Sequence, residues 1–196
     1  MTQAEGRDRW TLRYGDASGG DKAGSAWLLD AALQLPADAT VVDLAGGLGR
    51  HARPLAAQGR PVVLVDFVER ALRAATVSAS GISAVAADLW ELPFADASLD
   101  AIVIANFLER DLFPVYCRLL KPGGHLLYET YTRDHAALVA DGRARAPRSP
   151  QYMLAAGELP TLVKPLEVLR FREGFVEDAA GYRACSSILA RKNAGI

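Results

Sequence analysis

Short apolar runs alternate along the chain with segments of helical spacing. The runs at residues 41–44, 62–65 and 82–87 have the length of buried strands. The run at residues 101–105 is apolar throughout, as expected for a central parallel strand. Between the second and third runs, residues 69–80 show an amphipathic helical pattern. This alternation indicates an α/β fold with a parallel sheet.

The helices around the first strand have recognisable ends. Residues 25–33 show helical spacing behind a serine N-cap. Residues 50–59 fit a second helix that Gly59 ends as a C-terminal cap. If this helix began near Gly49, Pro54 would lie beyond the first turn and remove a backbone hydrogen bond. We therefore expect a late start or a kink.

The C-terminal part of the chain changes from alternation to a hairpin. Residues 111–120 fit a helix with a proline near its start, and a Pro-Gly-Gly turn leads from it into residues 124–131, a fifth strand. Residues 157–163 fit a short helix. Two further runs, residues 166–173 and 184–192, are expected to pair as a terminal hairpin.

A glycine-rich turn follows the first strand. Gly46, Gly47 and Gly49 allow a tight reversal and let backbone amides approach a ligand closely. Asp66 ends the second strand, where a carboxylate can accept hydrogen bonds from both hydroxyls of a ribose. The pattern predicts a nucleoside-binding half-site. It also fits the dinucleotide fingerprint G-x-G-x-x-A, completed by Ala52, with an acid about twenty residues on, so a nicotinamide oxidoreductase stays open.

Two further carboxylates favour a different nucleoside. Asp43 lies in the first strand just before the glycines, where it would repel a pyrophosphate and attract a ligand ammonium group. Asp88 follows the third strand and is placed to meet an adenine amino group. With these acids and the terminal hairpin, the chain resembles the class I S-adenosylmethionine-dependent methyltransferases over nearly its whole length.

Three stretches resemble a subgroup, the small tellurite-resistance-type methyltransferases: WTLRYG at residues 10–15, DLAGGLGRHA at residues 43–52 and YETYTRD at residues 128–134. The superfamily usually has glycine where this chain has Ala45, and alanine occurs there in the subgroup. The resemblance implies a single domain (1–196) with a Rossmann-like, seven-stranded, mostly parallel sheet, an antiparallel last strand and helices on both faces. It also implies methyl transfer with S-adenosyl-L-methionine as cofactor.

The resemblance assigns roles to individual residues. Asp66 would bind the ribose, Asp88 and the Leu89 amide the adenine, and the Asn106 backbone would lie near the methionine amine. Arg13 would pair with the methionine carboxylate, although a surface salt bridge explains it almost as well. The full set of expected cofactor-binding residues is Arg13, Asp43, Ala45, Gly46, Gly47, Gly49, Asp66, Phe67, Asp88, Leu89 and Asn106.

Two segments are candidates for the acceptor side. Residues 1–24 form an N-terminal arm, and its Trp10 and Tyr14 are expected to fold over the cofactor cleft. Residues 131–156 form a candidate lid that carries four arginines and one histidine, a charge that suits a small anionic acceptor. A solvated loop is the simpler interpretation for each arginine taken singly. The acceptor-side candidates are Tyr14, Tyr131, Arg133 and Arg148.

Composition narrows the remaining choices. The chain has 196 residues, 51% of them hydrophobic, and a net charge of −1, so we expect one soluble domain with a full core. Nucleic acid is a poor candidate partner because the charge is nearly neutral and the segment after Asn106 lacks the Pro-Pro-Tyr of base amino methyltransferases. Cys117 and Cys185 are expected as buried thiols in a reducing, cytoplasmic compartment. No spacing indicates a metal, a signal peptide or a membrane span.

Methyl transfer asks little of the protein beyond positioning and exclusion of water. A general base is needed only if the acceptor arrives protonated with a high pKa. The predicted function is therefore methyl transfer to a small anionic or nucleophilic acceptor. A binding module without catalysis remains an alternative, because the fold does not dictate function. An NAD-dependent oxidoreductase is a weaker one.

Overall fold

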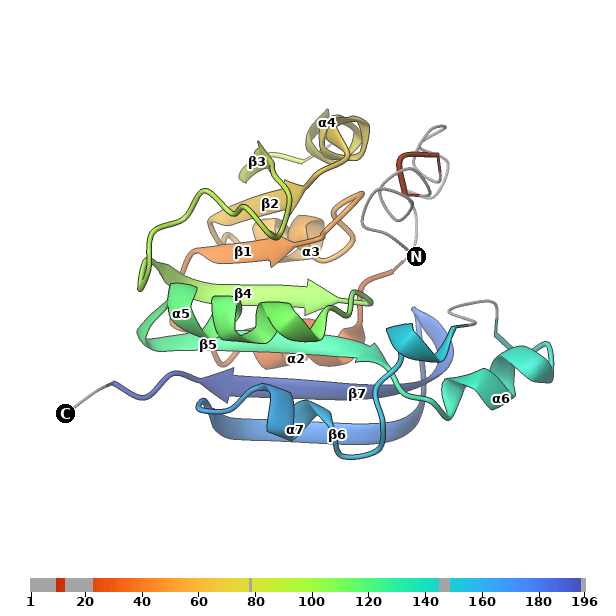
Figure 1. Cartoon of the computed structure of the whole chain (residues 1–196). Helices are drawn as coiled ribbons and strands as arrows, with labels where there is room; N and C mark the ends of the chain where they lie inside the picture. Colours follow the sequence, from red (N-terminus) through yellow and green to blue (C-terminus); the bar gives the residue numbers. More distant parts are fainter. Residues whose placement is uncertain (1–9, 13–22, 78, 145–148, 195–196) are drawn as a thin grey trace.

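The computed structural model describes residues 10–12, 23–77, 79–144 and 149–194 as a sheet covered on both faces (Figure 1). The sheet has seven strands in the order β3-β2-β1-β4-β5-β7-β6. Strands β1 to β5 are parallel, β7 is antiparallel to β5, and β6 is antiparallel to β7. The predicted fold class is confirmed. The strands are β1 Val41–Leu44, β2 Val62–Asp66, β3 Ile82–Ala86, β4 Leu99–Ala105, β5 Leu120–Tyr131, β6 Glu167–Asp178 and β7 Gly181–Arg191.

The helices divide between the two faces. Buried residues of α2, α3 and α4 pack on one face of the sheet, and those of α5 and α7 pack on the other. The labelled helices are α2 Ala26–Ala32, α3 Ala52–Ala57, α4 Glu69–Val77, α5 Phe113–Leu119, α6 His135–Ala140 and α7 Leu159–Leu162, with short 3-10 turns η1 Arg110–Leu112 and η2 Pro150–Tyr152.

Strand β4 shows why the central run is apolar throughout. Ala101 and Val103 point to the face of α2 and α3, while Ile102 and Ile104 point to the face of α5. All four side chains are buried, so neither face of the strand can hold a polar residue.

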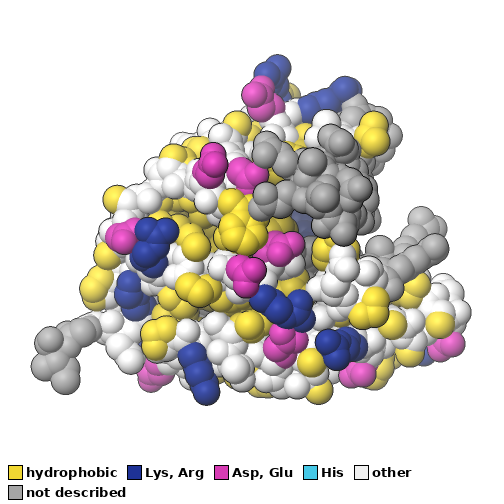
Figure 2. All heavy atoms as spheres, in the orientation of Figure 1, with side chains coloured by type: hydrophobic (Ala, Val, Ile, Leu, Met, Phe, Trp, Pro, Cys, Tyr) yellow, Lys and Arg dark blue, Asp and Glu magenta, His cyan; other side chains and the backbone are white. Residues whose placement is uncertain are grey.

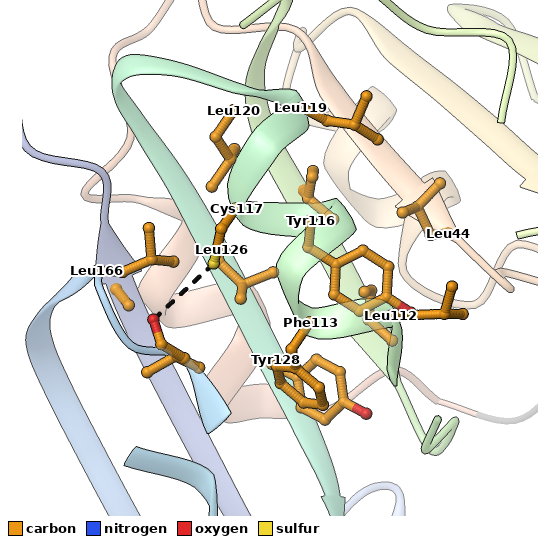
Figure 3. Close-up of a cluster of buried hydrophobic side chains, with 14 of the residues drawn as sticks. Leu44, Leu112, Phe113, Tyr116, Cys117, Leu119, Leu120, Leu126, Tyr128 and Leu166 are labelled. Carbon is orange, nitrogen blue, oxygen red and sulfur yellow. Dashed lines mark hydrogen bonds between the residues drawn. The ribbon is translucent and has the colours of Figure 1, made fainter. Parts of the chain in front are cut away.

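The core beneath α5 is rich in aromatic rings (Figure 3). The ring of Phe113 lies 4.9 Å from that of Tyr128 and 5.7 Å from that of Tyr116, measured between centroids. The Tyr128 hydroxyl donates to the Phe107 carbonyl, which fixes the chain just beyond β4. Cys117 is a buried free thiol in this core, as predicted, and Cys185 is buried in β7.

The expected helix ends are confirmed. The Ser25 hydroxyl caps α2 by accepting from the Leu28 amide at 3.3 Å. Helix α3 begins at Ala52, so Pro54 falls within the first turn, where its missing N–H is harmless. Gly59 follows α3 in the left-handed region, with φ of 82°.

Two other expectations concern the C-terminal part. The hairpin of β6 and β7 is confirmed. Strand β5 starts earlier than expected, because Leu120 already pairs with Leu99 before the register shifts across the Pro-Gly-Gly turn. Within the described residues, each helix is too short or too polar to cross a lipid bilayer.

Candidate cofactor and acceptor site

The carboxyl ends of the parallel strands form the edge at which the predicted residues meet. After β1, the backbone turns through left-handed conformations at Ala45 (φ 53°), Gly47 (φ 55°) and Gly49 (φ 73°). Only glycine adopts this region without strain, so Ala45 is held there against its preference. A Cβ added at Gly46 would lie 2.3 Å from a Leu64 methyl group, which explains the glycine at that position.

Asp43 lies beneath the glycine turn and is almost completely buried. Its Oδ2 accepts from the Ala52 amide at 3.1 Å, while its Oδ1 has no hydrogen-bond partner. Burial raises the pKa of this carboxyl to about 7, and the nearby Arg50 opposes the shift. An unpartnered buried carboxylate oxygen is what a cationic ligand group would compensate, through space or through a bridging water.

Asp66 links the two strands of the half-site. Its Oδ2 accepts from the Gly47 amide and its Oδ1 from the Val68 amide, both at 2.9 Å. Burial raises the pKa of this carboxyl, and these amides oppose the shift. Each oxygen keeps a second lone pair, so Asp66 can support the glycine turn and still accept from ribose hydroxyls. The sequence predicted only the ribose role.

A cavity of about 430 Å³ opens beyond β2 and β3. This volume suits a small ligand such as a nucleoside. Its lining carries three carboxylates and no lysine or arginine: Phe67, Glu69, Ala86, Ala87, Asp88, Glu91 and Pro93. Phe67 and Asp88 were predicted, whereas the two glutamates were not. The acidic lining disfavours a dinucleotide, because its pyrophosphate would meet like charge.

In the loop after β3, which carries Asp88, some side chains lie at the surface and others pack in the core. The Asp88 carboxylate accepts from the Trp90 amide at 3.1 Å, which shapes the turn after β3. The Leu89 side chain is buried in the core, so only its backbone amide is a candidate for adenine binding. Trp90 is 45% exposed, whereas Phe94 packs against the core. Core packing therefore explains why residue 94 is aromatic, but it does not explain the exposed Trp90.

Asn106 follows β4 in the left-handed region, with φ of 57°. Its amide N–H donates to the Glu129 carbonyl at 2.8 Å. Its side-chain oxygen, in the orientation that satisfies both groups, accepts from Arg50 Nη2 at 2.6 Å and Nη1 at 3.0 Å. Sequence reasoning missed Arg50, and the only signal for it was its place directly after Gly49.

The N-terminal arm meets the glycine turn at Gly24. A Cβ at Gly24 would lie 2.8 Å from the Arg50 carbonyl oxygen and 3.0 Å from the His51 ring. His51 Nε2 accepts from the Ser25 amide at 2.9 Å, and burial lowers the pKa of the imidazole to about 3. His51 is therefore a neutral hydrogen-bonded residue with a structural role.

The N-terminal arm carries three of the predicted residues, Trp10, Arg13 and Tyr14. Trp10 packs against the cluster of Leu48, Val68 and Ala71, beside the glycine turn, in line with the expected position of the arm. Arg13 and Tyr14 lie outside the described residues, so the roles expected for them stay predictions.

On the acceptor side, Tyr131 ends β5 and packs on His135, with ring centroids 4.4 Å apart. Burial raises the pKa of its hydroxyl, so Tyr131 is protonated at neutral pH. The Arg133 side chain is exposed, and its amide donates to the Leu154 carbonyl at 2.9 Å. Arg148 lies outside the described residues.

The candidate lid, residues 131–156, is anchored near both ends. Thr132 and Leu154 form a parallel bridge, and the Leu154 side chain is completely buried. Arg110 clamps the far end, with Nε 2.5 Å from Glu158 Oε1 and Nη2 3.1 Å from the Met153 carbonyl. Described residues near both ends of the lid are therefore fixed to the rest of the domain.

Comparison with known proteins identifies the domain. Residues 41–124 match the methyltransferase domain family. A demethylmenaquinone methyltransferase of Clavibacter sepedonicus is 34% identical over 110 residues, 52% of this chain and 45% of the relative. A 23S rRNA (guanine(748)-N(1))-methyltransferase of Streptomyces fradiae is 37% identical over 107 residues, 52% of this chain and 36% of the relative. Residues 41–124 are thus similar to a methyltransferase domain.

The similarity to solved structures extends over more of the chain. TehB from Haemophilus influenzae superposes with a TM-score of 0.69 and 22% identity, covering 92% of this chain and 66% of TehB. This likeness shows that the two chains share a fold. The matches to the curated relatives span less than half of their length, so their acceptors are not transferred to this chain.

The cofactor half of the methyltransferase domain fits S-adenosylmethionine, the cofactor of this class. Asp43 offers a buried, unpartnered carboxylate oxygen to a cation, Asp66 keeps free lone pairs, and the cavity beside Asp88 is acidic. The sequence predicted these three acids from their places at or near the carboxyl ends of the first three strands. The acceptor-side residues lie on less regular segments, and the structure describes only some of them.

Proposed function

We propose that the protein transfers the methyl group of S-adenosyl-L-methionine to a small acceptor that is anionic or otherwise nucleophilic. The acidic cavity beyond β2 and β3 carries the cofactor part of this proposal. Its lining includes Glu69, Asp88 and Glu91 but no lysine or arginine, which suits a positively charged sulfonium nucleoside, and Glu69 also pairs with Arg73 on the surface of α4. The match of residues 41–124 to methyltransferases supports the same conclusion.

The chain's own residues have three tasks in this reaction. When bound, the cofactor supplies an electrophilic methyl group. Asp66 and the glycine turn would hold the nucleoside, and Asp43 would favour the cationic end of the methionine moiety. The arm and the lid would exclude water from the acceptor. An anionic acceptor can attack without a side-chain base, which agrees with the protonated state of Tyr131 and the neutral state of His51.

A small acceptor is favoured over nucleic acid by the surface charge. In the view of Figure 2, the basic and acidic side chains of the described residues are interspersed rather than gathered into one basic face. The net charge of −1 gives no general attraction to a polyanion. The relatives named above act on a quinone precursor and on a ribosomal guanine, so an RNA acceptor belongs among the outcomes of the test.

The cofactor is tested by calorimetric titration with S-adenosylhomocysteine and, separately, with NAD. We expect wild type to bind S-adenosylhomocysteine and not NAD, and Asp66→Asn to weaken binding by about 1–3 kcal/mol, as for lost hydrogen bonds to a charged group. Asp38→Asn, at the opposite edge of the sheet, is the control and should bind like wild type. Preference for NAD would overturn the proposal.

The acceptor class is tested by turnover with radiolabelled S-adenosylmethionine. The panel contains small oxyanions, thiols, carboxylic acids, phenols and total RNA. Transfer to a small molecule supports the proposal, and transfer to RNA alone contradicts its acceptor part. Tight cofactor binding without transfer to any member would favour the binding module.

A further inference from the structure

Arg50 occupies a distinctive place among the cationic side chains of the described residues. It follows the last glycine of the turn, and both of its terminal nitrogens contact the single side-chain oxygen of Asn106. Asn106 is itself fixed by its left-handed backbone and by the bond from its amide to Glu129. The guanidinium is therefore held in one orientation at the carboxyl edge of β1 and β4.

The charge of Arg50 is not neutralised within the described part of the chain. Arg110, Arg172 and Arg183 each form an ion pair with a carboxylate, whereas Arg50 forms none with a described residue. Arg50 is half-buried, so its charge has lost part of its hydration. Asp43 is the nearby carboxyl, but burial raises its pKa to about 7 and it forms no ion pair with Arg50, so the partly desolvated guanidinium remains a site for an anion.

The neighbourhood indicates which anion fits. The contact with Asn106 places the Arg50 guanidinium at the carboxyl edge of β4, and Arg50 is close enough to Asp43 and Tyr131 to lower the pKa of both side chains. Asn106 occupies one edge of the guanidinium fork, and the remaining N–H groups can engage the two oxygens of a planar carboxylate.

We propose that Arg50, held by Asn106, binds a carboxylate at the methyl-transfer centre. This inference rests on the proposed function and extends it. The carboxylate belongs either to the methionine end of the cofactor or to the acceptor. With Asp43 beside the methionine ammonium and Arg50 beside its carboxylate, each charge of that group would meet its opposite.

The experiment compares S-adenosylhomocysteine with its decarboxylated analogue, which lacks only the carboxylate. Both are titrated into wild type, Arg50→Gln, Arg50→Lys and the control Arg118→Gln, a surface residue paired with Asp96. If the cofactor supplies the carboxylate, Arg50→Gln weakens S-adenosylhomocysteine binding by about tenfold or more, the effect of one charge-assisted hydrogen bond, and barely changes the analogue. Arg50→Lys keeps the charge without the fork and should lie between.

The second part of the experiment tests whether the acceptor supplies the carboxylate. If the acceptor supplies the carboxylate, both cofactor forms bind Arg50→Gln like wild type, and the KM of carboxylate acceptors rises by about tenfold while that of neutral acceptors stays unchanged. Binding and KM all within twofold of wild type would overturn the inference. Thermal unfolding of each variant separates these effects from misfolding.

A failure of the proposed function can be distinguished from a failure of the Arg50 inference. If wild type binds no S-adenosylhomocysteine, the proposed cofactor is wrong, and the Arg50 site is then read directly from the NMR resonance of its Nε–H during titration with malonate. A saturable shift that Arg118→Gln retains supports the carboxylate site. No shift overturns it.

Discussion

The Ser25 hydroxyl donates to the carboxylate of Glu129 at 2.9 Å and so joins the start of α2 to the end of β5. The same carboxylate accepts from Arg183 at 2.9 Å, Ser187 at 2.7 Å and Arg172 at 3.1 Å. Because the Ser25 amide also donates to His51, this buried cluster ties the sheet, the first helix and the glycine turn together. It fixes the point at which the N-terminal arm leaves the domain.

Replacement of Ser25 tests this junction. Ser25→Ala removes the cap of α2 and one donor to a buried carboxylate, so we expect a loss of about 1–3 kcal/mol in the free energy of unfolding. Ser25→Thr keeps the hydroxyl and should lose less. Urea unfolding measures both, with Ser83→Ala on the exposed edge strand as control. Equal stability of Ser25→Ala and wild type would show that the junction is not rigid.

The ion pair inside the cluster is expected to behave differently from one at the surface. Arg183 is buried between Glu129 and Asp178, with Nη1 2.6 Å from Asp178 Oδ1. Arg183→Met removes the ion-pair partner of Asp178 and leaves the buried Glu129 with Arg172 alone, so we expect a loss of about 3–5 kcal/mol. Arg191→Met breaks an exposed pair with Glu167 and should lose less than about 1 kcal/mol. Comparable losses in the two variants would contradict the role of burial.

The cofactor half could be predicted because it follows local rules. Strand β4 is apolar on both faces, Asp66 stands where a strand ends, and the glycines mark a turn, so each signal lies within a few residues. The buried ion cluster of Glu129 was not predicted. Its partners did not follow from sequence, because they come from three distant elements.

The contact of Arg50 with Asn106 was beyond prediction for a related reason. It depends on the left-handed backbone of Asn106 and on the side-chain conformation of Arg50, which is distant from Asn106 in the sequence. Neither feature leaves a periodic pattern. The lid was predicted as one irregular segment, whereas its ends are fixed by the bridge from Thr132 to Leu154 and by the ion pair of Arg110 with Glu158.

The buried carboxyl of Asp43 is expected to make stability depend on pH. Its pKa is raised from 3.8 to about 7, so the folded state holds the proton more tightly than the unfolded state. The stability that this proton provides is present below about pH 4 and is lost as the pH rises toward 7. Asp43→Asn removes this titration.

We therefore expect the free energy of unfolding of Asp43→Asn, relative to wild type, to rise between pH 4.5 and pH 8 by about 2–4 kcal/mol, the size of a shift of about three pKa units. The titration of His51 acts on both proteins and cancels in this difference. The same variant should bind S-adenosylhomocysteine more weakly. A difference in stability that does not change with pH would show that Asp43 is already ionised in the folded protein.

We expect the protein to tolerate Ala45→Gly, which introduces the glycine usual in the superfamily. Its left-handed backbone costs an alanine about 1–2 kcal/mol, and glycine loses about 0.5–1 kcal/mol of that gain to chain entropy. Ala45→Gly should therefore raise the free energy of unfolding slightly. Gly46→Ala is the matched contrast, since its Cβ would overlap Leu64 and the Asp43 carboxylate. Calorimetric melting in which Gly46→Ala is the more stable variant would refute this account of the turn.

Arg133 and Arg143 are the lid arginines within the described residues, and both side chains are exposed. Arg133 remains a candidate for acceptor binding. Arg143, in the same lid, lies with its guanidinium 4.5 Å from the centre of the Tyr182 ring, so its charge already has a structural use. We expect Arg133→Ala to reduce turnover of an anionic acceptor by about tenfold, the loss of one charge-assisted contact, while S-adenosylhomocysteine binding stays within twofold. Arg143→Ala should leave both close to wild type. Equal turnover by Arg133→Ala and wild type would remove Arg133 from the acceptor site and leave Arg50 as the described cation that faces the acceptor.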